Sequence, residues 1–155
     1  MKTVLSMPYH YDQLASVAQE LHALSDQCAI YAFSGDLGSG KTTLIREALA
    51  KFGVYEFAGS PTFGYLTVYK TAKKHQIFHF DLYRLSTLEE FVSLGFTDYI
   101  DQAMHSYERH ARERSWVFIE WPALVMPLLN KHACIVEQSH QDDETVRFIT
   151  VKLIA

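Results

Sequence analysis

The sequence contains few cysteines, and their placement argues against a disulfide-stabilised scaffold. Cys28 and Cys134 are the only two in 155 residues, they lie far apart in apolar surroundings, and neither belongs to a C-x-x-C pair. This pattern favours reduced thiols in a core over a disulfide or a metal site. The eight histidines show no spacing typical of metal ligands either. Cysteine usage therefore predicts a cytosolic protein.

Long apolar runs, targeting segments and an excess of positive charge are also missing. The sequence has no run of about 18 apolar residues, so no membrane span is predicted. It also has no charged and then apolar leader, so no secretory signal is predicted. The net charge is −4, from 14 Lys and Arg against 18 Asp and Glu. Binding of nucleic acid by the chain alone is therefore not favoured, although a local basic patch stays open. We expect a cytoplasmic protein.

The sequence does contain enough apolar residues, 48%, for one core, and no repeat or Pro/Gly/Ser-rich linker divides it. A single domain over residues 1–155 is therefore predicted. Apolar runs predict strands at 3–7, 28–33, 65–69, 76–81, 116–119, 134–138 and 146–153, and helical periodicity predicts helices at 14–24, 44–49, 88–94 and 97–110. This alternation predicts an α/β fold with a mixed, mainly parallel sheet, flanking helices and antiparallel edge strands.

One glycine-rich segment is hard to explain by packing. The pattern Gly35-x-x-x-x-Gly40-Lys41-Thr42 follows a predicted buried strand and precedes a predicted helix, which is the context of a phosphate-binding loop in a P-loop NTPase fold. Lys41 is expected to neutralise β- and γ-phosphate charge, and Thr42 to ligate magnesium. The loop residues expected to surround the nucleotide phosphates are Asp36, Leu37, Gly38, Ser39, Gly40, Lys41 and Thr42.

Two acidic residues stand at the ends of predicted strands. Asp81 closes the strand at 76–81, and Glu120 follows the strand at 116–119. Because the carboxyl ends of parallel strands meet at one edge of a sheet, both side chains are expected to face the loop. A magnesium nucleotide normally has a protein carboxylate nearby, so we predict Asp81 and Glu120 as metal-binding and catalytic residues beside Lys41. Which acid is closer to the metal stays open.

The turn Ser60-Pro61-Thr62 lies where P-loop hydrolases carry a segment that senses the γ-phosphate, although a plain turn explains these residues equally well. It precedes a predicted hairpin with a basic tip at 70–74. Guanine-specific proteins use Asn-Lys-x-Asp, and the nearest segment here, Asn130-Lys131-His132-Ala133, lacks the acid. We therefore expect ATP as the nucleotide.

Four blocks in this order together resemble the bacterial TsaE family. They are Gly-Asp-Leu-Gly-Ser-Gly-Lys-Thr-Thr at 35–43, Ser-Pro-Thr-Phe at 60–63, His-Phe-Asp-Leu-Tyr-Arg at 79–84 and Glu-Trp-Pro at 120–122. Many ATPases share the first block, whereas the last two make the resemblance specific. Ser39 departs from the usual alanine, and the segment 103–115 is longer than the family norm.

The resemblance implies a small ATPase required for threonylcarbamoyladenosine in tRNA. Such a protein binds a TsaB–TsaD heterodimer, hydrolyses Mg-ATP to support turnover by TsaD, and meets tRNA through that complex. The resemblance also implies that Thr43 supports the phosphate site and that Thr62 is a switch-like threonine. It assigns Asp81 and Glu120 to the metal and to hydrolysis, and Trp121 to the site or to a partner surface.

Two other functions stay open. Arg109, Arg112 and Arg114 would suit a lid over a transferring phosphate in a small-molecule kinase, but a solvated helix end beside Glu108 and Glu113 explains the same residues. The second is a nucleotide-dependent adaptor that senses ATP without needing hydrolysis.

Overall fold

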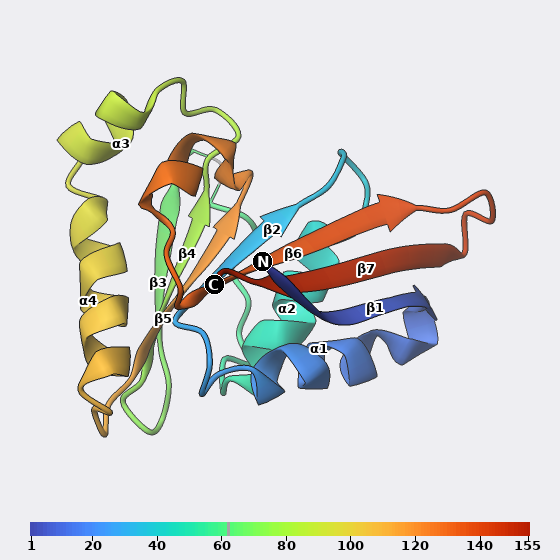
Figure 1. Ribbon diagram of the computed structural model, residues 1–155, viewed down its shortest axis with the longest axis horizontal. Coiled ribbons are helices and arrows are strands. Elements are labelled where there is room, and N and C mark those ends of the chain that lie inside the picture. The colour runs from blue at the N-terminus through green and yellow to red at the C-terminus, as the bar shows by residue number, and fades with distance from the viewer. Residues whose placement is uncertain (62) are drawn as a thin grey trace.

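The computed structural model describes residues 1–61 and 63–155, and its strands form one seven-stranded sheet with helices packed against it (Figure 1). The strands are β1 (Lys2–His10), β2 (Ile30–Ser34), β3 (Leu66–Lys70), β4 (Gln76–Asp81), β5 (Ser115–Glu120), β6 (Ala133–His140) and β7 (Val146–Leu153). The helices are α1 (Leu14–Ala23), α2 (Lys41–Lys51), α3 (Leu88–Ser93) and α4 (Thr97–Glu108), with 3-10 helices η1 (Tyr11–Gln13) and η2 (Pro122–Leu128). All the predicted strands and helices occur, with boundaries shifted by a few residues, whereas η1 and η2 were not predicted.

The sheet has the strand order β1-β7-β6-β2-β5-β4-β3. The four central strands, β6, β2, β5 and β4, run parallel, and antiparallel pairings join β1 to β7, β7 to β6 and β3 to β4. The predicted mixed α/β sheet with antiparallel pairings toward its edges is confirmed: β7 and β3 run opposite to the other described strands. The connection between β6 and β7 is short, which permits a hairpin but not a parallel crossover.

Alternation along the strands divides the core between the two faces of the sheet. On β5, Trp116 and Phe118 join the cluster formed with α1 and α2, whereas Val117 and Ile119 join the cluster formed with α3 and α4. Because successive side chains of a strand point to opposite faces, an unbroken apolar run is what a doubly covered strand requires. This explains why the buried runs of β2 and β5 carry few polar residues.

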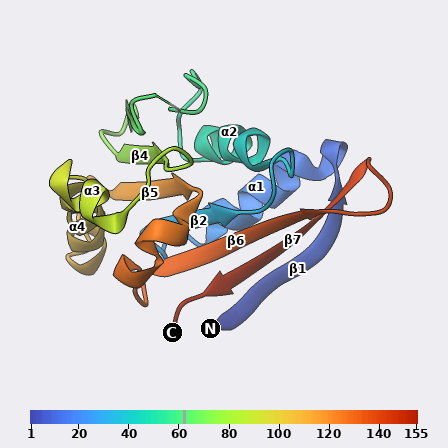
Figure 2. The same ribbon diagram turned by 90° about the horizontal axis from the view of Figure 1, so that it is seen from above.

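The termini lie side by side, because β1 pairs with β7 from Lys2 opposite Leu153 (Figures 1 and 2). Cys28 and Cys134 are buried and free, as predicted. Burial and the neighbouring Cys28 raise the pKa of the Cys134 thiol well above its ordinary value, so it stays protonated at neutral pH. Within the described residues, no helix combines the length and the hydrophobicity that crossing a bilayer requires.

Candidate functional site

The glycine loop, residues 35–42, connects the carboxyl end of β2 to the first turn of α2. Gly35 has φ +145°, and a Cβ there would come within 2.7 Å of the Ser39 hydroxyl and also meet the Gln138 carbonyl. Gly40, with φ +99°, is the residue immediately before α2. Both positions favour glycine, the first because the backbone is crowded and both because φ is positive. The loop therefore packs tightly against β6.

Lys41 begins α2 and turns its side chain back toward the loop. It is only 5% exposed, and its Nζ donates to the carbonyl oxygens of Gly35 at 2.6 Å and Asp36 at 2.9 Å. The ammonium also lies 4.1 Å from the ring centre of Trp121, a cation–π contact. Burial lowers the pKa of Lys41, and the charges of Glu120, Asp36 and Asp81 offset part of this effect. The loop thus holds a desolvated cation.

The N-terminus of α2 carries no capping side chain in the described structure. In α3, by contrast, the Thr87 side chain accepts from the Glu90 backbone N–H at 3.1 Å and so caps the helix. The first backbone N–H groups of an α-helix have no partner inside the helix. At α2 these donors, and the positive end of the helix dipole, are left for an anion.

The two predicted acids are brought together at the ends of adjacent strands. Asp81 and Glu120 are register partners on β4 and β5, and they are 6% and 2% exposed. Thr42 donates its hydroxyl to Glu120 Oε1 at 2.8 Å. Ser60 donates to Asp81 Oδ2 and is also 3.0 Å from Glu120 Oε2, and the backbone N–H of Tyr83 donates to Asp81 Oδ1 at 3.0 Å. Glu120 thus contacts α2 through Thr42, and both acids line a cavity shared with the glycine loop, as predicted.

His79 is a member of this network that sequence reasoning did not single out. Its Nε2 lies 2.8 Å from Glu120 Oε2, it is fully buried, and its Nδ1 has no hydrogen-bond partner among the described residues. Burial opposes ionisation of Glu120, but hydrogen bonds from His79, Thr42 and Ser60 outweigh it and hold the pKa of Glu120 below its ordinary value. A histidine two residues before a strand-ending acid was the available signal.

A cavity of about 500 Å³ opens between the loop and the two acids. Its lining residues are Leu37, Gly38, Gly40, Lys41, Thr42, Thr43, Ser60, Asp81, Tyr83, Glu120, Trp121 and Arg147. Arg147, from β7, is the second residue that sequence reasoning missed, since nothing local connects residue 147 to the loop. Trp121 has φ +58°, a conformation that costs a large side chain roughly 1–3 kcal/mol and is concentrated at functional sites.

Other predicted residues fall outside this cavity. Asp36 is exposed at the loop surface and Ser39 is buried beneath it. Thr62, the predicted switch-like threonine, lies outside the described residues. Across the described chain, His, Cys, Asp and Glu side chains form no group of three or more arranged to hold a metal ion. A metal at this cavity would accordingly rely on two carboxylates and a hydroxyl.

The three arginines of the kinase alternative lie at the other end of the sheet. They precede β5, whereas Glu120 ends it. Arg114 donates to the Ser25 carbonyl at 2.9 Å, and Arg109 contacts His105 at 3.1 Å. These arginines therefore do not form the lid that the kinase alternative would need, because the six residues of β5 separate their side chains from the glycine loop.

Comparison with known proteins assigns the family. The model of the family described as "Threonylcarbamoyl adenosine biosynthesis protein TsaE" matches residues 9–149. The chain is 37% identical over 101 residues to the tRNA threonylcarbamoyladenosine biosynthesis protein TsaE of Rickettsia prowazekii, covering 64% of this chain and 61% of that protein. It is 32% identical over 131 residues to the Haemophilus influenzae protein of the same name, covering 84% and 74%. The matched part is thus less than two thirds of the length of the Rickettsia relative.

The crystal structure of Bacillus subtilis YdiB has the same fold, with a TM-score of 0.66 at 17% identity, covering 100% of this chain and 89% of that one. The family match spans most of the chain and includes the loop, both acids and His79. On these grounds the chain belongs to the TsaE family of threonylcarbamoyl adenosine biosynthesis proteins.

Proposed function

We propose that this chain is a P-loop ATPase that binds and hydrolyses Mg-ATP to support tRNA threonylcarbamoyladenosine biosynthesis. The observation that carries the proposal is the convergence of Lys41, Thr42, Asp81 and Glu120 at one cavity. These residues come from α2, β4 and β5, so their meeting is not a local consequence of sequence. A tight glycine loop, an uncapped helix and two buried carboxylates together match the requirements of a magnesium nucleotide site.

The loop and α2 would hold the phosphates. The backbone N–H groups of the loop and the first turn of α2 donate to phosphate oxygens, and Lys41 neutralises their charge from its desolvated position. Thr43 lines the same cavity at the start of α2. Arg147 adds a second cation, supplied by this chain itself, at the rim.

Thr42, Glu120 and Asp81 would hold magnesium. Hard oxygen donors suit this ion, which takes one or two carboxylates and leaves its other positions to phosphates and water. When bound, magnesium supplies charge neutralisation to the phosphate being transferred. Glu120 is the better candidate for the acid nearer the metal, because its carboxylate already meets the Thr42 hydroxyl at 2.8 Å. No contact with Thr42 is described for Asp81, whose oxygens accept from Ser60 and Tyr83.

Hydrolysis requires a positioned water, and Glu120 is placed to orient one. Its lowered pKa keeps it ionised at neutral pH, so it accepts a hydrogen bond from the attacking water. The water oxygen bonds to the γ-phosphorus while the bond from phosphorus to the bridging oxygen breaks, and ADP keeps that electron pair. One proton of the water stays on the released phosphate and the other passes to solvent. His79 would hold the Glu120 carboxylate in place through the 2.8 Å contact between its Nε2 and Glu120 Oε2.

A second cavity, of about 340 Å³, is suited to the nucleoside. It adjoins the first through shared Gly40, Thr43 and Arg147, and Tyr9 and Tyr11 supply aromatic surface for a base. The segment Asn130–Ala133 lies instead at the start of β6, at the opposite end of the sheet. ATP therefore remains the proposed nucleotide.

The proposed partners are TsaB and TsaD, with ATP hydrolysis supporting repeated turnover of their complex and tRNA reached through that complex. Family membership supports this assignment. Two buried, free cysteines favour action in the cytoplasm, where thiols stay reduced.

Reconstituted tRNA modification tests the proposal. Wild-type protein with TsaB and TsaD should release phosphate and support many turnovers, whereas Lys41→Ala should support neither. Lys51→Ala, at the exposed far end of the same helix, is the matched control and should behave like wild type. Equal phosphate release with and without TsaB and TsaD would reject the coupling.

Glu120→Gln separates hydrolysis from nucleotide-dependent assembly. If hydrolysis is needed, this variant should still assemble with TsaB and TsaD but stop after the first turnover. Full multiple turnover by Glu120→Gln would support the adaptor alternative instead.

A further inference from the structure

A concentration of positive charge lies at the end of the sheet opposite the glycine loop. The β3–β4 turn, residues 70–75, and the segment before β5, residues 109–114, together hold six of the 14 Lys and Arg but only one of the 18 Asp and Glu. We call these two segments the basic edge. Their formal charge is +5, on a chain whose total is −4. The low overall charge therefore conceals a local surface of the opposite sign.

Tertiary structure joins the two segments into one surface. The Arg114 backbone N–H donates to His75 Nδ1 at 2.9 Å, and the Gln76 N–H donates to the Arg114 carbonyl at 2.9 Å. Both turns lie at the same end of the sheet in Figure 1. Burial lowers the pKa of His75, and the charges of Lys73 and Arg114 lower it further, as expected where positive charge accumulates.

Most cations of the basic edge point into solvent. Lys73, Lys74, Arg109 and Arg112 are exposed, and within the described chain no carboxylate lies within salt-bridge distance of them. Arg114 is different, because its guanidinium lies against the rings of Tyr107 and Trp116 and so serves packing. Among the exposed cations, Arg109 contacts His105 at 3.1 Å, and no ring contact is described for Lys73, Lys74 or Arg112.

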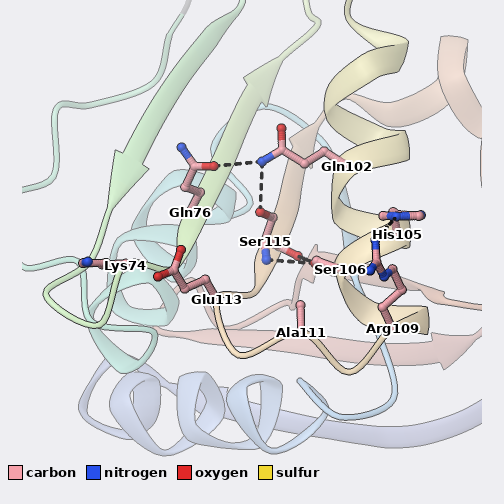
Figure 3. Close-up of a pocket in the computed structure, with 9 residues that line it drawn as sticks. All are labelled: Lys74, Gln76, Gln102, His105, Ser106, Arg109, Ala111, Glu113 and Ser115. Carbon is pink, nitrogen blue, oxygen red and sulfur yellow. Dashed lines mark hydrogen bonds between the residues drawn. The ribbon is translucent and has the colours of Figure 1, made fainter.

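A cavity of about 390 Å³ adjoins the basic edge (Figure 3). Its lining residues are Lys74, Gln76, Gln102, His105, Ser106, Arg109, Ala111, Glu113 and Ser115. The Gln102 amide donates to Gln76 Oε1 at 2.8 Å and lies 3.3 Å from Ser115 Oγ. Figure 3 shows Gln76, Gln102 and Ser115 joined by these bonds and Arg109 beside His105, and the Glu113 side chain belongs to the same lining.

This cavity is separate from the proposed ATP site. Ser115 begins β5 and lines the cavity, whereas Glu120 ends the same strand at the ATP site. At the usual rise of a strand, the two are roughly 17 Å apart. A ligand at the basic edge would therefore not compete for the nucleotide pocket.

We propose that the basic edge binds the phosphate backbone of RNA. Spaced Lys and Arg side chains together with Gln and Ser groups are the combination that contacts phosphates and sugars. The proposal goes beyond the ATPase function, since it gives this chain a direct contact with RNA. The acidity of the remaining surface limits the affinity, so we expect a dissociation constant of roughly 1–100 µM at physiological salt.

Anisotropy titrations of a labelled, unmodified tRNA transcript test the proposal. The variant Lys73→Glu/Arg112→Glu should weaken binding about tenfold and make the slope of log K against log salt shallower by about 2. The control Lys2→Glu/Arg46→Glu has the same net charge and changes two exposed residues elsewhere, and it should bind within about twofold of wild type. The neutral variant Lys73→Gln/Arg112→Gln should give an intermediate loss of binding. It replaces the charge reversals as the test if either of them disturbs folding.

Three results would overturn the proposal: no salt-dependent binding by wild type, equal weakening by both double variants, or binding of poly-glutamate as tight as that of RNA. The last result would assign the edge to an acidic protein. Phosphate release without RNA should be unchanged in Lys73→Glu/Arg112→Glu. A failed RNA contact and a failed ATPase function are thus distinguishable, because Lys41→Ala removes hydrolysis while leaving the basic edge intact.

Discussion

The two ends of β4 and β5 differ in how they hold charge. At the carboxyl ends, Asp81 and Glu120 are buried and tied to hydroxyl groups. At the amino ends, the basic edge exposes its cations to solvent. Burying a charge is costly unless partners compensate it, so such an arrangement is typical of chemistry, whereas exposed charge is typical of reversible contact with a partner. The same two strands therefore carry two kinds of surface.

The largest expected effect is that of Lys41→Ala on hydrolysis. Removal of the buried cation should lower the rate of phosphate release by about 100-fold, because the loop loses its main charge complement to phosphate. A steady-state phosphate assay with Lys51→Ala as control measures this. A rate within threefold of wild type would show that the buried Lys41 is not needed for hydrolysis, and the carboxyl ends of the strands would then lose their proposed chemical role.

Gly35→Ala should lower the free energy of unfolding by about 3 kcal/mol, because a Cβ meets the Gln138 carbonyl and the Ser39 hydroxyl in a left-handed backbone. Gly59→Ala separates strain from crowding, since φ is +84° there but no atom of residues 1–61 or 63–155 lies within 4 Å of the added carbon. Its cost should be about 1 kcal/mol. Urea denaturation gives both values, and equal costs would show that crowding at the loop is unimportant.

His79→Leu should lower kcat for ATP hydrolysis about tenfold while KM changes little, because Glu120 loses the contact that orients it. His79→Gln, which keeps a donor, should recover part of the rate. A parallel rise in KM with unchanged kcat would indicate a role in nucleotide binding rather than in orienting the acid.

The stability of the protein without nucleotide should depend on Glu120 in acid. Because its pKa is lower in the folded state than in the unfolded one, ionised Glu120 stabilises the fold fully above its ordinary pKa of about 4.5. This contribution is lost as pH falls through the lowered folded value. Urea midpoints between pH 7 and pH 3 should therefore fall less steeply for Glu120→Gln than for wild type. Identical profiles would mean that the network does not favour the ionised acid.

The smallest expected effect is that of Lys74→Glu/Arg109→Glu on hydrolysis without RNA. Both residues line the cavity of the basic edge and lie far from the loop, so the rate should stay within about twofold of wild type. Phosphate release at low and moderate salt measures this. A tenfold loss would show that the two ends of the sheet are coupled.

Much of the fold was predictable because its signals are local. Apolar runs marked the strands, and helical periodicity marked the helices. The pairing of β1 with β7 could not be predicted, since strand partners far apart in sequence leave no local signal. The longer segment at 103–115 became interpretable only when the structure placed its second half beside the β3–β4 turn.

By itself, the sequence determined the glycine loop, the two acids at strand ends and the family resemblance, because each rests on residue type and short spacing. Only the tertiary structure decided that Glu120 meets Thr42, that His79 and Ser60 join the acids, and that Arg147 reaches the loop from the last strand. It also placed Arg109, Arg112 and Arg114 at the basic edge, away from the glycine loop. Such contacts depend on which strands pair and in which register, and that depends on packing of the whole chain.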